Sequence, residues 1–200
     1  MYSIHGTAIQ QYAQESSNNL SDVILMVALS IQQNWSTVGY QMQDVKDVGG
    51  SSRFLWGNKK KTYNYLQARK DFMYGQFMAV VNSKKSEAHK AATLMTIFLR
   101  VPGLGLAKAG FVCQLTAGLV GCIDTHNIRM YGINEKHLKL PNTLKSQTIR
   151  TSRINQYINI CHSIGTEQLW NNWCNFLGDR DKSWNNGFEV SEAHYNYLIQ

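Results

Sequence analysis

FLRVPGLGLAKAGFVCQLTAGLVGCIDTHNIRM, residues 98–130, is a strongly apolar segment that also holds a turn, a lysine and an aspartate. Pro102, Gly103 and Gly105 predict a tight turn between two apolar helices, because proline fixes the backbone and glycine lets it turn closely. The first amides of the second helix have no partner within that helix, and such an N-terminus favours an anion. The turn therefore indicates a phosphate-binding hairpin, and an ordinary helical hairpin with a glycine loop remains the alternative.

Asp124 ends the connector that follows the apolar helix, directly before Thr125 and His126. We expect it near the N-terminus of the next helix, where aspartate is a common capping residue. A carboxylate beside a buried segment can also act in catalysis. Both roles stay open for Asp124, and one does not exclude the other.

The composition bounds the fold class. Two hundred residues, 44% of them hydrophobic and 16% charged, suffice for one domain with a core or for two small lobes that share a cleft. The chain has only two prolines and no convincing alternating strand pattern, so we predict an all-α protein. The predicted helices cover 20–42 (with Ser21 and Asp22 as N-cap residues), 62–81, 83–100, 106–118, 124–133, 145–165, 166–179 and 190–200. The most loop-like segment is 47–61.

The net charge of +7 favours a polyanionic partner, with nucleic acid first and an anionic membrane second. A basic surface that only aids solubility is the alternative. Candidate contacts are the basic run Lys59, Lys60 and Lys61, together with Arg100 before the turn and Arg129 after Asp124. The lysine run could equally be a solvated loop.

The four cysteines have no C-x-x-C spacing, which is typical of reduced thiols in a cytosolic protein and predicts no metal site. The first residues lack a basic region followed by an apolar one, so we expect no secretory signal. The longest apolar run, DVILMVALSI, is about half a membrane span. We therefore expect a cytoplasmic protein that does not enter a membrane.

Three motifs in order resemble those of the helix-hairpin-helix DNA glycosylases, the superfamily of endonuclease III and of the adenine-mismatch and 8-oxoguanine glycosylases. Here they read LMVALSIQ at 25–32, VPGLG at 101–105 and IDTH at 123–126. The resemblance covers residues 20–135, with the hairpin at 98–113. It implies a single two-lobed helical domain over 1–200, in which helices of 136–200 pack with the N-terminus.

The resemblance also implies site residues. Asp124 would stabilise the oxocarbenium charge that develops on the sugar, or activate water, and Gln32 would enter the duplex where a base is flipped out. Gly103 and Gly105 would bind a DNA phosphate. Some family members carry a four-cysteine iron–sulfur cluster, which this chain does not match, so no cofactor is expected.

Lys108 lies one residue beyond the position where bifunctional family members carry a Schiff-base lysine. Neighbouring residues of a helix differ by about 100° in direction, so we expect Lys108 to point away from the pocket. A monofunctional enzyme with Lys108 near a phosphate is the first expectation. A lyase lysine and a solvated lysine stay open. Trp35, Tyr40 and His126 are candidate walls of a base pocket, and core positions are the alternative for both Trp35 and Tyr40.

The function implied is a monomeric DNA N-glycosylase that flips a damaged, mismatched or modified base from double-stranded DNA and hydrolyses its glycosidic bond. A nucleoid-associated or phage-encoded protein fits this expectation. Two alternatives remain. One is a phage-type transferase that modifies DNA bases on the same scaffold, and the other is a non-catalytic DNA-binding module.

Overall fold

The computed structural model describes residues 2–140, 147–180 and 182–199, and every regular element in them is helical, as predicted. The α-helices are α1 (Tyr2–Glu15), α2 (Ser17–Leu29), α3 (Val38–Val48), α4 (Gly57–Val81), α5 (Glu87–Phe98), α6 (Leu106–Ala117), α7 (Thr125–Met130), α8 (Gln147–Ile164), α9 (Thr166–Arg180) and α10 (Gly187–Ile199). Three short 3₁₀ turns join them: η1 (Trp35–Thr37), η2 (Gly49–Ser51) and η3 (Glu135–Leu138).

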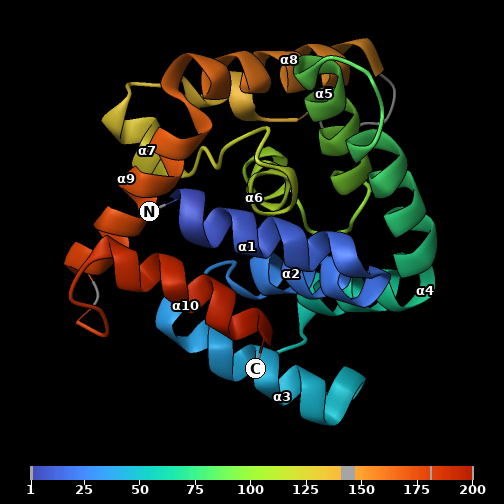
Figure 1. The fold of residues 1–200 in the computed structure, drawn as a ribbon, viewed down its shortest axis with the longest axis vertical. Helices are drawn as coiled ribbons and strands as arrows, with labels where there is room; N and C mark the ends of the chain where they lie inside the picture. The colour runs from blue at the N-terminus through green and yellow to red at the C-terminus, as the bar shows by residue number, and fades with distance from the viewer. Residues whose placement is uncertain (1, 141–146, 181, 200) are drawn as a thin grey trace.

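Helix α6 lies at the centre of the molecule and is seen almost end-on in Figure 1. All of residues 109–116 are buried, and a helix that is apolar on every side needs neighbours all round. Helices α1, α2 and α5 supply these neighbours. The predicted helix over 106–118 and the turn before it are confirmed. The connector after α6 runs back along it, since Cys122 N donates to Gln114 Oε1 and Gly121 lies against Gly110, and this brings Asp124 towards the end of α6 that follows the hairpin.

Helix α2 is the second buried rod, and its final ten residues are nearly all in the core. Its N-cap is Ser16, whose side chain accepts a hydrogen bond from the amide of Asn19, so the prediction of Ser21 and Asp22 as caps is wrong. The single helix predicted over 20–42 is also wrong. The helix ends at Leu29, and the chain passes through a loop and η1 before α3 begins at Val38.

Helix α4 begins earlier than predicted. Residues 57–61 form its first turn rather than part of a loop, and α3 extends to Val48. Leu55 is buried just before α4 and anchors this connection, while Trp56 serves as the N-cap residue and remains exposed. The lysine run therefore lies on a helix, and each of its three side chains points in a different direction.

The C-terminal helices close the fold around the first one. Figure 1 shows α10 running beside α1, and α10 also packs on α9 and α3. His194 of α10 is fully buried in an aromatic cluster and stacks on Trp35, with 4.1 Å between ring centroids. Burial lowers the pKa of His194 to about 3, so the neutral ring is the form that packs there. Among the described residues, no helix has both the length and the apolar character needed to cross a membrane.

Candidate active site

A cavity of about 780 Å³ lies where the loop after α2 meets the first residues of α6 and α7 and the second half of α9. Gln32, Trp35, Lys108 and Asp124, four residues singled out in the sequence, all line it. The other lining residues are Ser30, Gln33, Asn34, Trp173, Phe176, Leu177, Arg180 and Lys182. The cavity thus combines a carboxylate, several cations, amide side chains and an aromatic wall.

Asp124 is the N-cap of α7, as predicted. Its Oδ1 accepts a hydrogen bond from the amide of Asn127 at 2.9 Å, and the side chain is half-buried. In the described part of the chain this is its one hydrogen bond from another group, which leaves Oδ2 for a ligand. Asp124 can therefore present this oxygen to whatever occupies the cavity.

The connector before Asp124 is held from both sides. The fully buried Tyr157 of α8 donates its hydroxyl proton to the carbonyl of Gly121 at 2.9 Å and accepts from the amide of Ile123 at 2.8 Å. Gln114 of α6 accepts from the amide of Cys122 at 3.1 Å. These bonds fix the backbone directly before Asp124, so the carboxylate has a defined position.

Lys108 lines the cavity, contrary to the expectation that it points away. Its Nζ donates to Ser30 Oγ at 3.1 Å and lies 5.5 Å from the centre of the Phe111 ring. Ser30 is the C-cap of α2, and the negative end of a helix favours a cation. The long side chain therefore extends from the first turn of α6 to the end of α2, and its length outweighs the direction of its Cα–Cβ bond.

Gln32 has a left-handed backbone, with a φ of 56°, and is the one described non-glycine residue with a positive φ. Its side chain is exposed at the cavity. Such a conformation costs about 1–3 kcal/mol in a residue other than glycine and is found disproportionately at functional sites. The loop thus holds the amide side chain at the mouth of the cavity at some cost in stability.

The aromatic wall comes largely from α9, which the sequence analysis did not assign to the site. Trp173 and Phe176 line the cavity, and Trp35 packs edge-on against Trp173 with centroids 5.2 Å apart. Trp35 is 4% exposed, and its Nε1 has no hydrogen-bond partner in the described structure. The spacing of Trp170, Trp173 and Leu177 indicates one buried helix face, yet nothing local shows which elements it meets.

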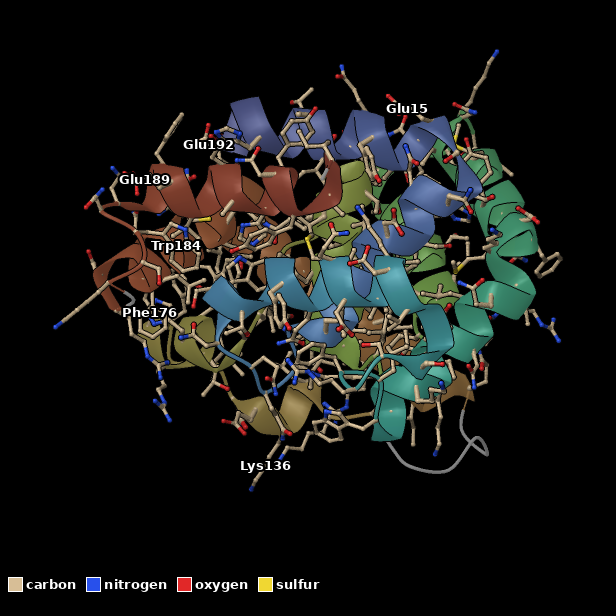
Figure 2. The ribbon with its side chains drawn as sticks, turned by 90° about the horizontal axis from the view of Figure 1, so that it is seen from below. Glu15, Lys136, Phe176, Trp184, Glu189 and Glu192 are labelled. Carbon is tan, nitrogen blue, oxygen red and sulfur yellow. The ribbon has the colours of Figure 1, made fainter. Side chains whose placement is uncertain are left out.

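Two predicted pocket residues lie elsewhere. His126 stacks on Phe176, with centroids 4.0 Å apart, and so supports the wall from behind without lining the cavity. Figure 2 labels Phe176 on the side of the molecule where α9 lies close to α7. Tyr40 is 59% exposed on α3 and does not contribute to the cavity, because the break in the helix at 30–37 changes the direction of its face.

The three lysines of 59–61 have separate environments. Lys59 is only 5% exposed, and its Nζ donates to the carbonyl of Leu29 at 2.8 Å, so the expected phosphate contact does not hold for it. Burial lowers the pKa of Lys59, and the charge of Lys108 lowers it further. Lys60 donates to the carbonyl of Gly50, and Lys61 is exposed.

The hairpin lies against the first turns of α4. Gly103 has a φ of 87°, and a Cβ there would lie 3.0 Å from Asn58 Cβ, so this position requires glycine. Thr62 Oγ1 donates to the carbonyl of Pro102 at 2.6 Å. Gly105 is exposed and is the N-cap of α6, and no side chain among the described residues caps that end. Arg100 and Arg129 are both exposed outside the cavity.

The remaining features of the described structure offer fewer reactive or charged groups. Free thiols are found at all four cysteines, each buried, and burial raises the pKa of Cys113 and Cys161 to about 12. A second hollow, of about 870 Å³, follows one face of α8 and is lined by hydroxyl and amide side chains with Ile160. No group of three or more His, Cys, Asp or Glu residues in the described ranges is arranged to hold a metal ion.

Comparisons with protein-family models, with curated proteins and with solved structures gave no match to this chain.

Proposed function

We propose that the protein is a DNA N-glycosylase that binds a flipped base in the cavity and hydrolyses its glycosidic bond. The observation that carries the proposal is the meeting of Gln32, Lys108 and Asp124 at one cavity with an aromatic wall. These residues come from three separate segments of the chain. A merely structural role for each would not require them to share an opening.

Asp124 is the proposed catalytic residue. Departure of the base leaves positive charge on the deoxyribose, and a carboxylate beside the sugar stabilises that charge or accepts a proton from the attacking water. Oδ1 is engaged in capping α7, so Oδ2 is the oxygen that would face the sugar. The fixed connector before Asp124 supports this role, because electrostatic stabilisation depends on groups placed in advance.

Trp173 and Phe176 would hold the flipped base, since aromatic rings stack on the face of any base. Gln32 would fill the space that the base leaves in the duplex. Its exposed side chain at the mouth and its constrained backbone support that assignment. The open N-terminus of α6 at Gly105 would contact a backbone phosphate.

A lyase step by Lys108 is a second candidate activity, favoured by the location of its amine in the same cavity as Asp124. The neutral amine would attack C1′ of the abasic aldehyde and, with loss of water, form an imine. In the purely hydrolytic enzyme, the ammonium of Lys108 would instead bind a phosphate near the sugar. The two roles differ in whether a covalent intermediate with the amine forms.

A base-modifying transferase is a third candidate, since the cavity volume of about 780 Å³ is in the range that holds drug-sized ligands and is larger than a single base requires.

The proposal of a DNA glycosylase also includes a double-stranded DNA partner, a cytoplasmic and nucleoid-associated location and a monomeric state. The net charge of +7 supports a polyanionic partner.

The proposal is tested on duplexes that carry uracil, oxidised pyrimidines, 8-oxoguanine, alkylpurines, mismatches or phage-type modified bases. The expected result is release of one of these bases by the wild-type protein and its loss in Asp124→Asn. A base retained with added mass on the DNA would indicate the transferase. Binding without chemistry on every duplex, unchanged in Asp124→Asn, would leave only a DNA-binding module and would overturn the proposal.

A further inference from the structure

An exposed aromatic and basic surface adjoins the cavity. Its members are Tyr40 of α3 and the residues Arg53, Phe54 and Trp56 from the turn before α4, and we name these four residues the platform. Tyr40 is 59% exposed and Trp56 is 55% exposed, although both are large side chains. Leu55 is buried between the half-buried Phe54 and the exposed Trp56, and it anchors the turn.

Contacts within the platform hold Tyr40, Arg53 and Phe54 together, while Trp56 contacts Lys59. Tyr40 and Phe54 meet edge to face with centroids 5.6 Å apart. The guanidinium of Arg53 lies 4.9 Å from the Phe54 ring centre and 5.8 Å from that of Tyr40. Arg53 Nη2 also donates to the Tyr40 hydroxyl at 2.9 Å. The surface is therefore preorganised, and these side chains lose little freedom when a ligand binds.

The platform has the chemistry of a binding surface for unpaired nucleic acid. Exposed ring faces stack on bases of any sequence, and an adjacent cation binds the backbone. Arginine has five N–H donors, and only one is used by Tyr40. In the described ranges no carboxylate pairs with Arg53, and Asp44 and Asp47 follow Tyr40 along α3.

Two contacts connect the platform to the cavity. Gln41, next to Tyr40, donates to the side chain of Gln33 at the cavity mouth at 3.5 Å. At the other end, Lys59 Nζ lies 5.4 Å from the Trp56 ring centre and donates to the carbonyl of Leu29, directly before Ser30 of the cavity. The platform and the cavity are therefore linked through the buried side chains of Gln41 and Lys59.

We infer that the platform binds unpaired DNA beside the cavity, with bases stacked on Tyr40 and Trp56 and a phosphate on Arg53. The inference rests on the proposed function only in taking the strand to be DNA. It adds a preference for unpaired DNA, because bases that remain stacked in a duplex offer no free face to the rings of Tyr40 and Trp56. It also gives Tyr40 a role outside the base pocket.

The test is fluorescence anisotropy with a labelled oligothymidine of about fifteen nucleotides, which covers a typical site for one domain. Tyr40→Ala and Trp56→Ala are each expected to weaken binding at least about fivefold. Tyr40→Phe keeps the ring and should bind nearly as wild type. Phe72→Ala is the matched control, because Phe72 is 61% exposed in the second half of α4, away from the platform in sequence.

Equal affinities for wild type, Tyr40→Ala, Trp56→Ala and Phe72→Ala would overturn the inference. So would a platform variant that changes the sedimentation of the protein alone and leaves oligothymidine binding intact, since the platform would then be a protein interface. The assay contains no base to be released. Platform-dependent binding with no base release from any duplex would thus contradict the proposed glycosylase while the platform inference stands.

Discussion

Lys108 in the first turn of α6 and Asp124 at the N-cap of α7 line the same cavity. The helix ends explain how the two charges are accommodated. The carboxylate lies at a positive helix terminus, and the ammonium reaches Ser30 at the negative terminus of α2. The anion and the cation are therefore held at separate helix ends that face the same cavity.

The charge of Lys108 should matter more than its nucleophilicity if the enzyme is hydrolytic. Lys108→Ala should lower base release by about tenfold, through loss of a charge-assisted phosphate contact, whereas Lys108→Arg should retain most of it. Borohydride reduction in the presence of abasic DNA provides the second measurement. A covalent complex trapped with wild type and lost in both variants would establish the lyase step instead.

The left-handed conformation of Gln32 gives a prediction about stability. The free energy of unfolding should be about 1 kcal/mol higher for Gln32→Gly than for Gln32→Ala, because glycine adopts the φ of 56° without strain. Urea denaturation of the two variants measures the difference. Both variants lack the amide side chain, so both should bind duplex DNA more weakly than wild type by a similar factor. Duplex affinities equal to that of wild type in both variants would contradict a role for the side chain.

The two hairpin glycines should respond differently to a methyl group. Gly103→Ala should reduce the free energy of unfolding by about 1–2 kcal/mol, because the φ of 87° and the nearby Asn58 both oppose a Cβ. Gly105→Ala should cost less, about 0.5 kcal/mol, since the space beside Gly105 is open and only the N-cap preference for glycine over alanine is lost. If a phosphate approaches this turn, however, Gly105→Ala should weaken duplex binding. Unchanged binding would argue against a phosphate site at the hairpin.

His194 predicts sensitivity to acid. Its pKa is about 3 in the folded protein against an ordinary value of 6.5, so below pH 6.5 the unfolded chain binds a proton that the folded chain does not. The stabilisation is present above pH 6.5 and falls by about 1.4 kcal/mol per pH unit as the pH decreases towards 3. Burial lowers the pKa of His5 as well, and its effect has the same sign.

His194→Phe tests this directly. The variant should show a shallower decrease in melting temperature between pH 6.5 and pH 4.5 than wild type, whatever its stability at neutral pH. Parallel melting curves for the two proteins over this range would contradict the assignment of acid sensitivity to the buried ring.

Local sequence signals predicted the elements that depend on local physics. The apolar character of α6, the glycine turn and the capping aspartate each reside in a few consecutive residues, and all three are found as predicted. The break after Leu29 was missed because the apolar spacing continues past it. Only the tertiary structure holds Gln32 in its left-handed conformation. Because of this break, Tyr40 lies on the platform and not in the pocket where it was expected.

The contributions of α9 and Lys59 depend on long-range contacts. Trp173 and Phe176 reach the cavity because α9 packs beside α7 and α10, which no local pattern specifies. Lys59 would ordinarily be expected in solvent, and its burial follows from the meeting of α4 with the end of α2. A single sequence therefore indicated one side of the cavity and did not indicate the other.

The measurement that tests the account most directly is single-turnover base release by wild type and Asp124→Asn on the duplex that the substrate screen identifies. Asparagine caps a helix about as well as aspartate, so the variant should melt at nearly the same temperature. We predict that its rate of base release falls by at least about a hundredfold. Equal rates in the two proteins, or no base released by wild type from any duplex, would contradict the assignment of Asp124 as a catalytic residue of a DNA glycosylase.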